Sequence, residues 1–209
     1  AELGIRVGDP MVIAQGMLSL AGDRIASRAI DDRIGAFVVL EAIRMLSDDP
    51  PVAAATAVAT VQEEIGYTGG GARTSAYSLV PDVAIVVDVT FSTDVPDIDK
   101  KELGEHKLGG GPVLSRGSSS SNEVFKMLSQ VAEKEGIPYT IQAAPKATRT
   151  DADGIFLTRH GVPTGLVSVP NRYMHSPNEV VSLEDVKNSA RLIAAFIRRL
   201  NSDTDFTPR

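Results

Sequence analysis

The chain has 209 residues, of which 43% are hydrophobic, and this is enough apolar material for one well-packed core. Its net charge is -6 and it has no basic stripe, which argues against a nucleic acid as a partner. It contains no cysteine, which excludes disulfides and thiolate metal ligands. No stretch is long and apolar enough to cross a bilayer, and no signal peptide is recognisable. We therefore expect no membrane partner and a cytoplasmic location.

The first part of the chain predicts a short apolar strand over 11–14 and a weak strand near 24–25. Helical spacing then predicts a helix over 36–46, ended by the turn at 47–51. The expected inward face of this helix carries Phe37, Leu40, Ile43 and Leu46. An uncharged run over 57–62 predicts a buried strand.

The rest of the chain alternates between helical and strand patterns. The expected helices cover 72–78, 123–135 with Asn122 as the cap, a short stretch ending at His160, and 183–200 after Ser182. The expected strands cover 81–89, 139–143 and 163–169, and the segment 90–121 is expected to be irregular. This alternation predicts an α/β fold with a largely parallel sheet, followed by a flexible tail over 202–209.

Ionisable residues stand where several of these elements end. Glu63 and Glu64 follow the run over 57–62, so the chain must end its strand or bend there if both serve one site, and Gly66 permits a bend. The other candidates are Asp31 before the first helix, Asp88 at the end of the strand over 81–89, and His175 after the strand over 163–169. Sites in open α/β sheets form beyond the carboxyl ends of strands.

Carboxylates with an imidazole and no thiolate suit zinc, cobalt or manganese in a hydrolytic site. A site for two metals needs a shared carboxylate, further ligands for each ion and a base for the water, and this inventory contains them. Each residue also has a simpler explanation. The acidic pair could be a solvated turn, Asp31 and Asp32 a helix cap, Asp88 a turn residue, and His175 an ordinary loop histidine.

Other features are not assigned to a site. His106 and His160 are interpreted as structural or exposed. The glycines at 109–111 are not followed by the lysine of a phosphate-binding loop, so nucleotide binding is rejected. No G-x-S-x-G motif is present, which argues against a serine nucleophile of the α/β-hydrolase type.

Six short motifs together resemble the M42 metallo-aminopeptidases, a family that includes the tetrahedral aminopeptidases and proteins once called endoglucanases. The motifs are AIDDRIG at 29–35, VQEEIG at 61–66, DVT at 88–90, GGP at 110–112, TDA at 150–152 and RYMHSP at 172–177. They follow the family's order and cover nearly the whole chain. The resemblance implies a three-layer α/β/α sandwich with a mixed, largely parallel sheet, and a catalytic peptidase domain over 1–201. It also implies peptide substrates and a homo-oligomer, in which dimers assemble to a dodecamer.

The resemblance also implies roles for individual residues. Asp31 would bridge two divalent metal ions, Glu64 and His175 would be terminal ligands of one ion, and Asp88 would be a ligand of the other. Glu63 would be the general base, taking a proton from the metal-bridging water and passing it to the leaving amine. Zinc is the expected ion, and cobalt or manganese suits the same ligands. The candidates for binding the substrate are Gly111, Asp151, Arg172 and Tyr173.

The chain departs from the family pattern at its beginning. It starts after the family's H-x-D histidine ligand and after its inserted β-rich dimerisation domain, so we expect this chain alone to have little or no activity. The alternatives are a non-catalytic fragment or assembly module of such an enzyme, and a glycosidase. The adjacent Glu63 and Glu64 are poorly placed to flank a sugar, and an aromatic content of 5% without tryptophan argues against a sugar platform.

Overall fold

A computed structural model describes residues 3–66, 70–96 and 98–207. Its central feature is a four-stranded sheet with the strand order β3-β6-β4-β5. The strands are β3 (Ala84–Phe91), β4 (Val113–Gly117), β5 (Thr140–Ala144) and β6 (Thr164–Asn171). The pairs β3–β6 and β4–β5 are parallel, whereas β4 and β6 are antiparallel. The predicted mixed, largely parallel sheet is therefore confirmed.

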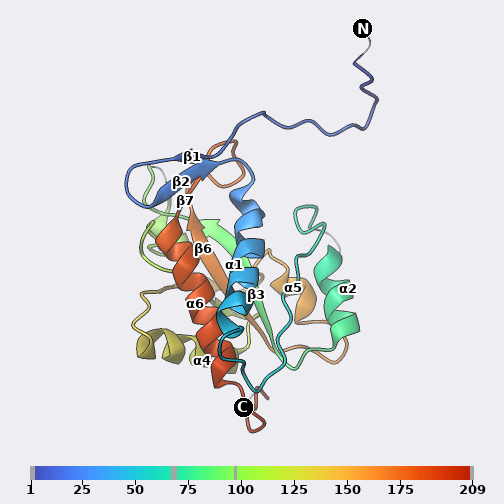
Figure 1. Cartoon of the computed structure of the whole chain (residues 1–209), viewed down its shortest axis with the longest axis vertical. Helices are drawn as coiled ribbons and strands as arrows, with labels where there is room; N and C mark the ends of the chain where they lie inside the picture. The colour runs from blue at the N-terminus through green and yellow to red at the C-terminus, as the bar shows by residue number, and fades with distance from the viewer. Residues whose placement is uncertain (1–2, 67–69, 97, 208–209) are drawn as a thin grey trace.

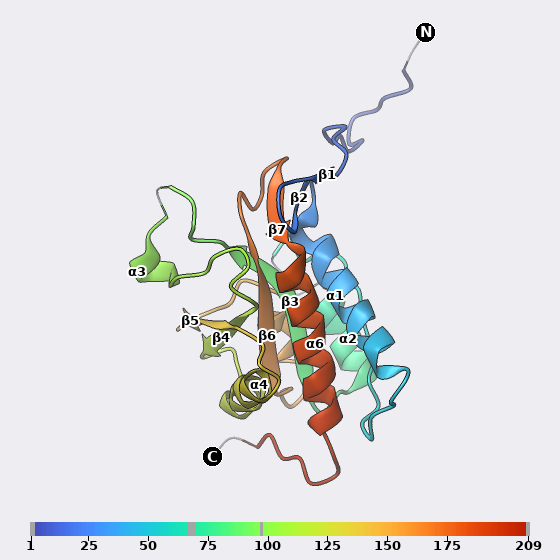
Figure 2. The same ribbon diagram turned by 60° about the vertical axis from the view of Figure 1, so that its left-hand side comes forward.

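Helices cover both faces of this sheet, as Figures 1 and 2 show. One face carries α1 (Ile30–Leu46), α4 (Asn122–Lys134) and α6 (Leu183–Arg199). On the other face α5 (Ala152–Ile155) packs against β6, and α2 (Gly70–Leu79) contacts α5. Because neighbouring strand residues point to opposite faces, Val167 of β6 joins the main core under α1, α4 and α6, while Leu166 packs in a smaller cluster with α5. The expected three layers are present.

A second, antiparallel sheet lies at the end of this body from which the N-terminal segment extends (Figure 1). It consists of β1 (Leu18–Ser19), β2 (Arg24–Ser27) and β7 (Glu179–Ser182), in that order. The weak strand predicted near 24–25 is confirmed as β2, whereas β7 was not predicted. All four residues of β7 are buried, and the strand leads directly into α6.

Several predicted elements are confirmed to within a few residues: α2, β3, β5, β6 and α6. Ser182 caps α6 as expected, because its Oγ atom accepts a hydrogen bond from the backbone N–H of Asp185. The cap predicted for α4 was wrong by one residue, since Ser121, rather than Asn122, accepts the bond from the N–H of Val124. The helix expected to end at His160 is shorter and covers only α5.

The strand predicted over 57–62 is not formed, and neither is the strand over 11–14. Within the described residues, the backbone at 57–62 pairs with no strand, and the carbonyl of Val61 instead accepts a hydrogen bond from Gly71 N at 2.8 Å. An uncharged, β-branched sequence becomes a strand only when a neighbouring strand supplies hydrogen-bond partners. The composition of these segments predicted a strand, but no pairing supports one.

The inward face predicted for α1 was also partly wrong. Phe37 is 53% exposed and Leu40 is 62% exposed, while Val38, Ala42 and Leu46 are buried. Two neighbouring apolar stripes run along this helix, and the stripe with the smaller side chains faces the body. Small residues allow α1 to lie close to α6 and β3, with which it makes its main contacts.

The segment 90–121, predicted to be irregular, contains α3 (Lys100–Leu103) and the central strand β4. Glycines and prolines around β4 conceal this strand in the sequence. Gly117 is needed there, because a Cβ atom at this position would lie 1.7 Å from the carbonyl oxygen of Ala144 on β5. Gly117 therefore weakens the strand pattern in the sequence, but its lack of a side chain allows β4 to pair with β5.

Beyond α6, Phe206 is buried and its ring stacks on Phe196 with a centroid distance of 6.3 Å. The flexibility expected for 202–209 stays a prediction. None of the helices in the described ranges combines the length and apolar character needed to cross a bilayer.

Candidate metal centre

Asp31 and Asp32 stand at the start of α1, where the backbone is not yet helical and the peptide bond between them is cis. The Oδ1 atom of Asp32 accepts a hydrogen bond from Gly35 N at 2.9 Å. A Cβ atom on Gly35 would lie 2.1 Å from Oδ2 of Asp32, so a glycine is required for this contact. The capping role considered for the aspartate pair is thus filled by Asp32, while the carboxylate of Asp31 makes a different contact.

Asp31 meets Glu64 and His175 in a group that we call the histidine cluster. The Nε2 atom of His175 lies 3.1 Å from Oδ2 of Asp31 and 3.8 Å from Oε2 of Glu64. One potential ligand atom from each residue lies within 4.8 Å of the other two. The side chains of His175 and Glu64 are exposed, whereas that of Asp31 is only 10% exposed. Solvent and ligands can therefore reach this cluster from one side.

Asp31 also meets Asp32 and Asp88 in a second group, the aspartate cluster, again with one carboxylate oxygen from each residue within 4.8 Å of the others. Asp88 lies inside β3 rather than at its end, in register with Ser168 of β6. Asp32 was not predicted to belong to the site, although its position beside Asp31 was a signal for it. Asp31 is the member common to both clusters.

Burial and mutual repulsion shift the ionisation of these carboxylates. Burial raises the pKa of Asp32 to about 9, with the charge of Asp88 adding to the effect. Burial raises the pKa of Asp88 to about 8 against an opposing hydrogen bond from the N–H of Val89. Burial and the charge of Glu64 raise the pKa of Asp31 to about 6. A bound divalent cation would favour the charged forms, so the donor set of carboxylates and one imidazole fits zinc, cobalt or manganese.

Glu63 lies next to the clusters and is half-buried. Burial raises its pKa to about 7, and the charges of Asp151 and Glu64 contribute in the same direction. The bend expected after the run over 57–62 is present, because Gln62 and Gly66 have φ values of 68° and 66°. As a result, Glu63 is more buried than Glu64 even though the two are adjacent in sequence.

Asp151, one of the candidates for substrate binding, accepts a hydrogen bond on Oδ2 from Thr60 Oγ1 at 2.5 Å. Its other oxygen, Oδ1, is buried and has no hydrogen-bond partner in the part of the chain that the structure describes. Burial raises the pKa of this carboxyl group, and the hydrogen bond from Thr60 opposes the shift. The charge of Asp151 acts on both Glu63 and Asp88, which shows that it borders the same site.

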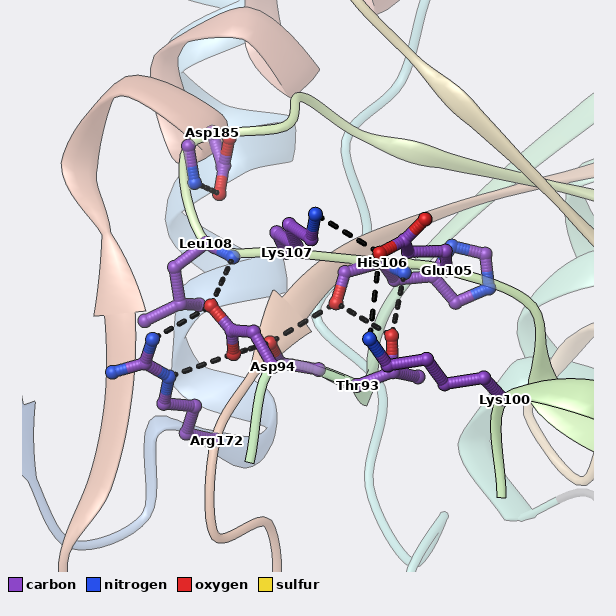
Figure 3. Close-up of polar contacts among 11 residues, drawn as sticks. Thr93, Asp94, Lys100, Glu105, His106, Lys107, Leu108, Arg172 and Asp185 are labelled. Atoms are coloured by element: carbon purple, nitrogen blue, oxygen red, sulfur yellow. Dashed lines mark hydrogen bonds and ion pairs between the residues drawn. The ribbon is translucent and has the colours of Figure 1, made fainter. Parts of the chain in front are cut away.

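Arg172 and Gly111, also candidates for substrate binding, are occupied by contacts within the chain. The Nε and Nη2 atoms of Arg172 donate to the two carboxylate oxygens of Asp94 at 2.7 and 2.6 Å (Figure 3). The N–H of Gly111 donates to Oδ1 of Asp185 at 2.7 Å. Tyr173, in contrast, is 54% exposed.

His106 is buried, with Nδ1 2.7 Å from Thr140 Oγ1 and Nε2 2.7 Å from the carbonyl oxygen of Leu103. His160 is exposed. The interpretation of both residues as structural or exposed is therefore confirmed.

Sequence reasoning missed Glu179, a buried carboxylate that accepts backbone hydrogen bonds from both Asp31 and His175. Its position four residues after His175 carried no signal that could be interpreted without the fold.

Comparison with known proteins shows which family the chain resembles over most of its length. A family model described as M42 glutamyl aminopeptidase matches residues 1–192. The chain is 37% identical over 207 residues to the lysyl aminopeptidase of Pyrococcus furiosus, a match that covers 99% of this chain and 58% of that protein.

Two solved structures show the same similarity. An aminopeptidase from the archaeon Desulfurococcus kamchatkensis matches with 40% identity and a TM-score of 0.81, over 94% of this chain and 55% of that one. The TET1 peptidase of Pyrococcus horikoshii, which can assemble into a tetrahedron or a large octahedral shell, matches with 30% identity and a TM-score of 0.71, over 90% of this chain and 54% of that one. The chain thus spans little more than half the length of the relatives it matches.

Proposed function

This chain belongs to the M42 peptidase family, and from this premise we propose that it is part of a metal-dependent aminopeptidase that removes N-terminal residues from peptides. The observation that carries the proposal is the position of Asp31, whose carboxylate belongs to both the histidine and the aspartate cluster. A site for two ions requires one shared carboxylate of this kind.

In this proposal Asp31 would contribute to the positions of both divalent ions, Glu64 and His175 would complete the ligands of one, and Asp88 would hold the other, with Asp32 beside it. Zinc is the first expectation, and cobalt or manganese suits the same donors. When bound, the ions would polarise the scissile carbonyl and favour ionisation of the attacking water. The partly exposed histidine cluster leaves room for the end of a peptide to approach.

Glu63 acts as the general base. It accepts a proton from the water whose oxygen bonds to the carbonyl carbon, and it returns this proton to the amine nitrogen when the carbon–nitrogen bond breaks. The raised pKa of Glu63, about 7, supports this role because a group that titrates near neutral pH can both accept and donate a proton. Its half-buried position beside the clusters supports the same role.

The contacts of the four substrate-binding candidates divide them into two pairs. The unpartnered Oδ1 of Asp151 and the exposed ring of Tyr173 support direct contact with the peptide. The hydrogen bonds of Arg172 and Gly111 support an indirect role, in which these residues fix the segments around the site. The assembling TET1 relative supports a homo-oligomer as the working form.

The proposal is tested on the full-length protein of which this chain is proposed to be part. The assay is hydrolysis of a panel of aminoacyl-p-nitroanilides, with zinc, cobalt or manganese added to chelator-treated protein. Metal-dependent release of p-nitroaniline is the expected result, and metal analysis should find two ions per chain. Two other outcomes would overturn the proposal: cleavage of oligosaccharides instead would favour a glycosidase, and the absence of both activities and of bound metal would favour an assembly module.

A further inference from the structure

We propose that Glu179 is a positioning residue that fixes Asp31 and His175 relative to each other, and so sets the geometry of the histidine cluster. This inference rests on the proposed function, because it concerns the residues proposed to hold the ions. Glu179 stands at the start of β7, outside every motif that identified the site in the sequence.

The carboxylate of Glu179 joins three segments that are distant in the sequence. Its Oε2 atom accepts hydrogen bonds from the backbone N–H groups of Ile30 at 2.6 Å and Asp31 at 3.2 Å. Its Oε1 atom accepts from His175 N at 3.2 Å and from Asn171 Nδ2 at 3.3 Å. The start of α1, the end of β6 and the loop that carries His175 therefore meet at one side chain.

The chemistry of this position requires a carboxylate. All four partners are donors, two on each oxygen, so both ends of the side chain must be acceptors. Glutamine has the same shape, but its NH2 group would face one pair of donors. Glu179 is only 2% exposed, so water cannot readily replace a lost acceptor. The backbone N–H of either Asp31 or His175 would then lose its hydrogen bond to residue 179.

Two features connect this anchor to the site rather than to stability alone. First, the anchored residues carry the side chains that approach to 3.1 Å in the histidine cluster. Second, the backbone of His175 has a φ of 64°, in the left-handed region that residues other than glycine adopt uncommonly, and the hydrogen bond from His175 N to Glu179 helps to hold it there. Glu179 itself is fixed by the pairing of β7 with β2, where it stands opposite Ser27.

The test compares Glu179→Gln with Asp185→Asn, a matched control. Asp185 is also a buried carboxylate, and its two oxygens accept the backbone N–H groups of Gly109 and Gly111 at 2.7 Å. Both variants should lower the melting temperature. Cobalt binding is then measured by calorimetry and by the visible spectrum of the bound ion, well below the melting temperature of each protein.

We expect Glu179→Gln to weaken cobalt binding by about 10- to 100-fold, the usual effect of losing a group that orients a ligand, and to change the cobalt spectrum. Asp185→Asn should bind cobalt with the affinity and spectrum of the wild type. Wild-type behaviour of Glu179→Gln, or an equal loss in Asp185→Asn, would overturn the proposal. If Glu179→Gln does not fold, Glu179→Asp replaces it. The shorter carboxylate cannot span both pairs of donors, so wild-type affinity in that variant would also overturn the proposal.

Hydrogen exchange of the metal-free proteins provides a readout that does not depend on the proposed function. Either the backbone amides of residues 30 and 31 or that of residue 175 should exchange faster in Glu179→Gln, depending on which pair of donors meets the new NH2 group. Unchanged rates at all three amides would refute this role of Glu179. If the wild-type protein binds no cobalt, the proposed function fails, while the exchange rates still decide whether Glu179 holds these segments.

Discussion

The Oδ2 atom of Asp31 lies 3.1 Å from Nε2 of His175, while the same carboxylate forms the aspartate cluster with Asp32 and Asp88. No other residue in the described ranges belongs to both groups. This relationship makes the two clusters dependent on one side chain, and it separates the expected behaviour of Asp31 variants from that of the other candidates.

Asp31→Asn should lower the occupancy of both ions, because a shared ligand loses its charge. His175→Ala should mainly empty one position, and Asp88→Asn should mainly empty the other. Metal content per chain, measured by mass spectrometry after equilibration with limiting zinc, distinguishes these patterns. Two tightly bound ions in Asp31→Asn would show that this carboxylate does not bridge.

In the full-length protein, Glu63→Gln should reduce kcat by roughly two to four orders of magnitude, the usual contribution of a general base, while metal content stays near that of the wild type. The amide keeps the shape of the side chain but cannot accept the proton. Steady-state kinetics and metal analysis on the same preparation check both parts. Wild-type turnover would remove Glu63 from the mechanism.

The pair formed by Asp94 and Arg172 should make stability depend on pH in the acid range. Burial acts to raise the pKa of Asp94, but hydrogen bonds from Arg172 and Ser92, with the charge of Arg172, outweigh it and lower the pKa to about 2. Because the folded-state pKa lies below the unfolded value of 3.8, the stabilisation is fully present above about pH 4 and is lost as the pH falls toward 2.

Asp94→Asn should therefore lower the melting temperature clearly at pH 6 and less at pH 3. The control is Glu41→Gln, which removes the carboxylate of a surface pair with Arg44 on α1. Surface pairs of this kind contribute little, so its melting temperature should stay close to that of the wild type at both values. An Asp94→Asn effect that does not change with pH would contradict the assigned pKa shift.

Gly35→Ala should destabilise the start of α1, because the new Cβ atom would occupy the space of the Asp32 carboxylate. Displacement of this carboxylate should also disturb its position relative to Asp31 and Asp88 in the aspartate cluster. Loss of the cap alone typically costs about 0.5–2 kcal/mol of folding free energy. Gly16→Ala is the matched control, since a Cβ atom there meets nothing within 4 Å and its φ is not positive. Chemical denaturation of both variants measures the difference. Equal stability of the two would show that Asp32 can move without cost.

The two helices with strong amphipathic patterns, α4 and α6, could be predicted from the sequence to within about a residue because local spacing defines them. The run over 57–62 could not be interpreted correctly, since its composition predicted a strand and only the fold shows that no strand pairs with it. The strands β4 and β7 were missed for the complementary reason. They are short and their pairing, rather than their composition, makes them strands.

The candidate site divides in the same way. Asp31, Glu63, Glu64, Asp88 and His175 were found because they stand in motifs or at the ends of predicted elements, and the structure brings them together. Asp32 was seen only as a helix cap, and it fills that role while also facing Asp88. Glu179 could not be found, because its importance lies in hydrogen bonds to residues remote in sequence, which no local pattern records.

The register between β3 and β6 has a consequence for the folding of this chain. It sets Asp88 opposite Ser168 and Phe91 opposite Asn171, and Asn171 in turn donates to Glu179. The site is thus assembled from segments that lie about 80 residues apart in the sequence, and closing such long loops is slow compared with forming a helix. During refolding from denaturant, the helical circular dichroism signal should recover before the protein can bind cobalt. The rate at which cobalt binding returns would therefore measure how fast the tertiary structure is completed.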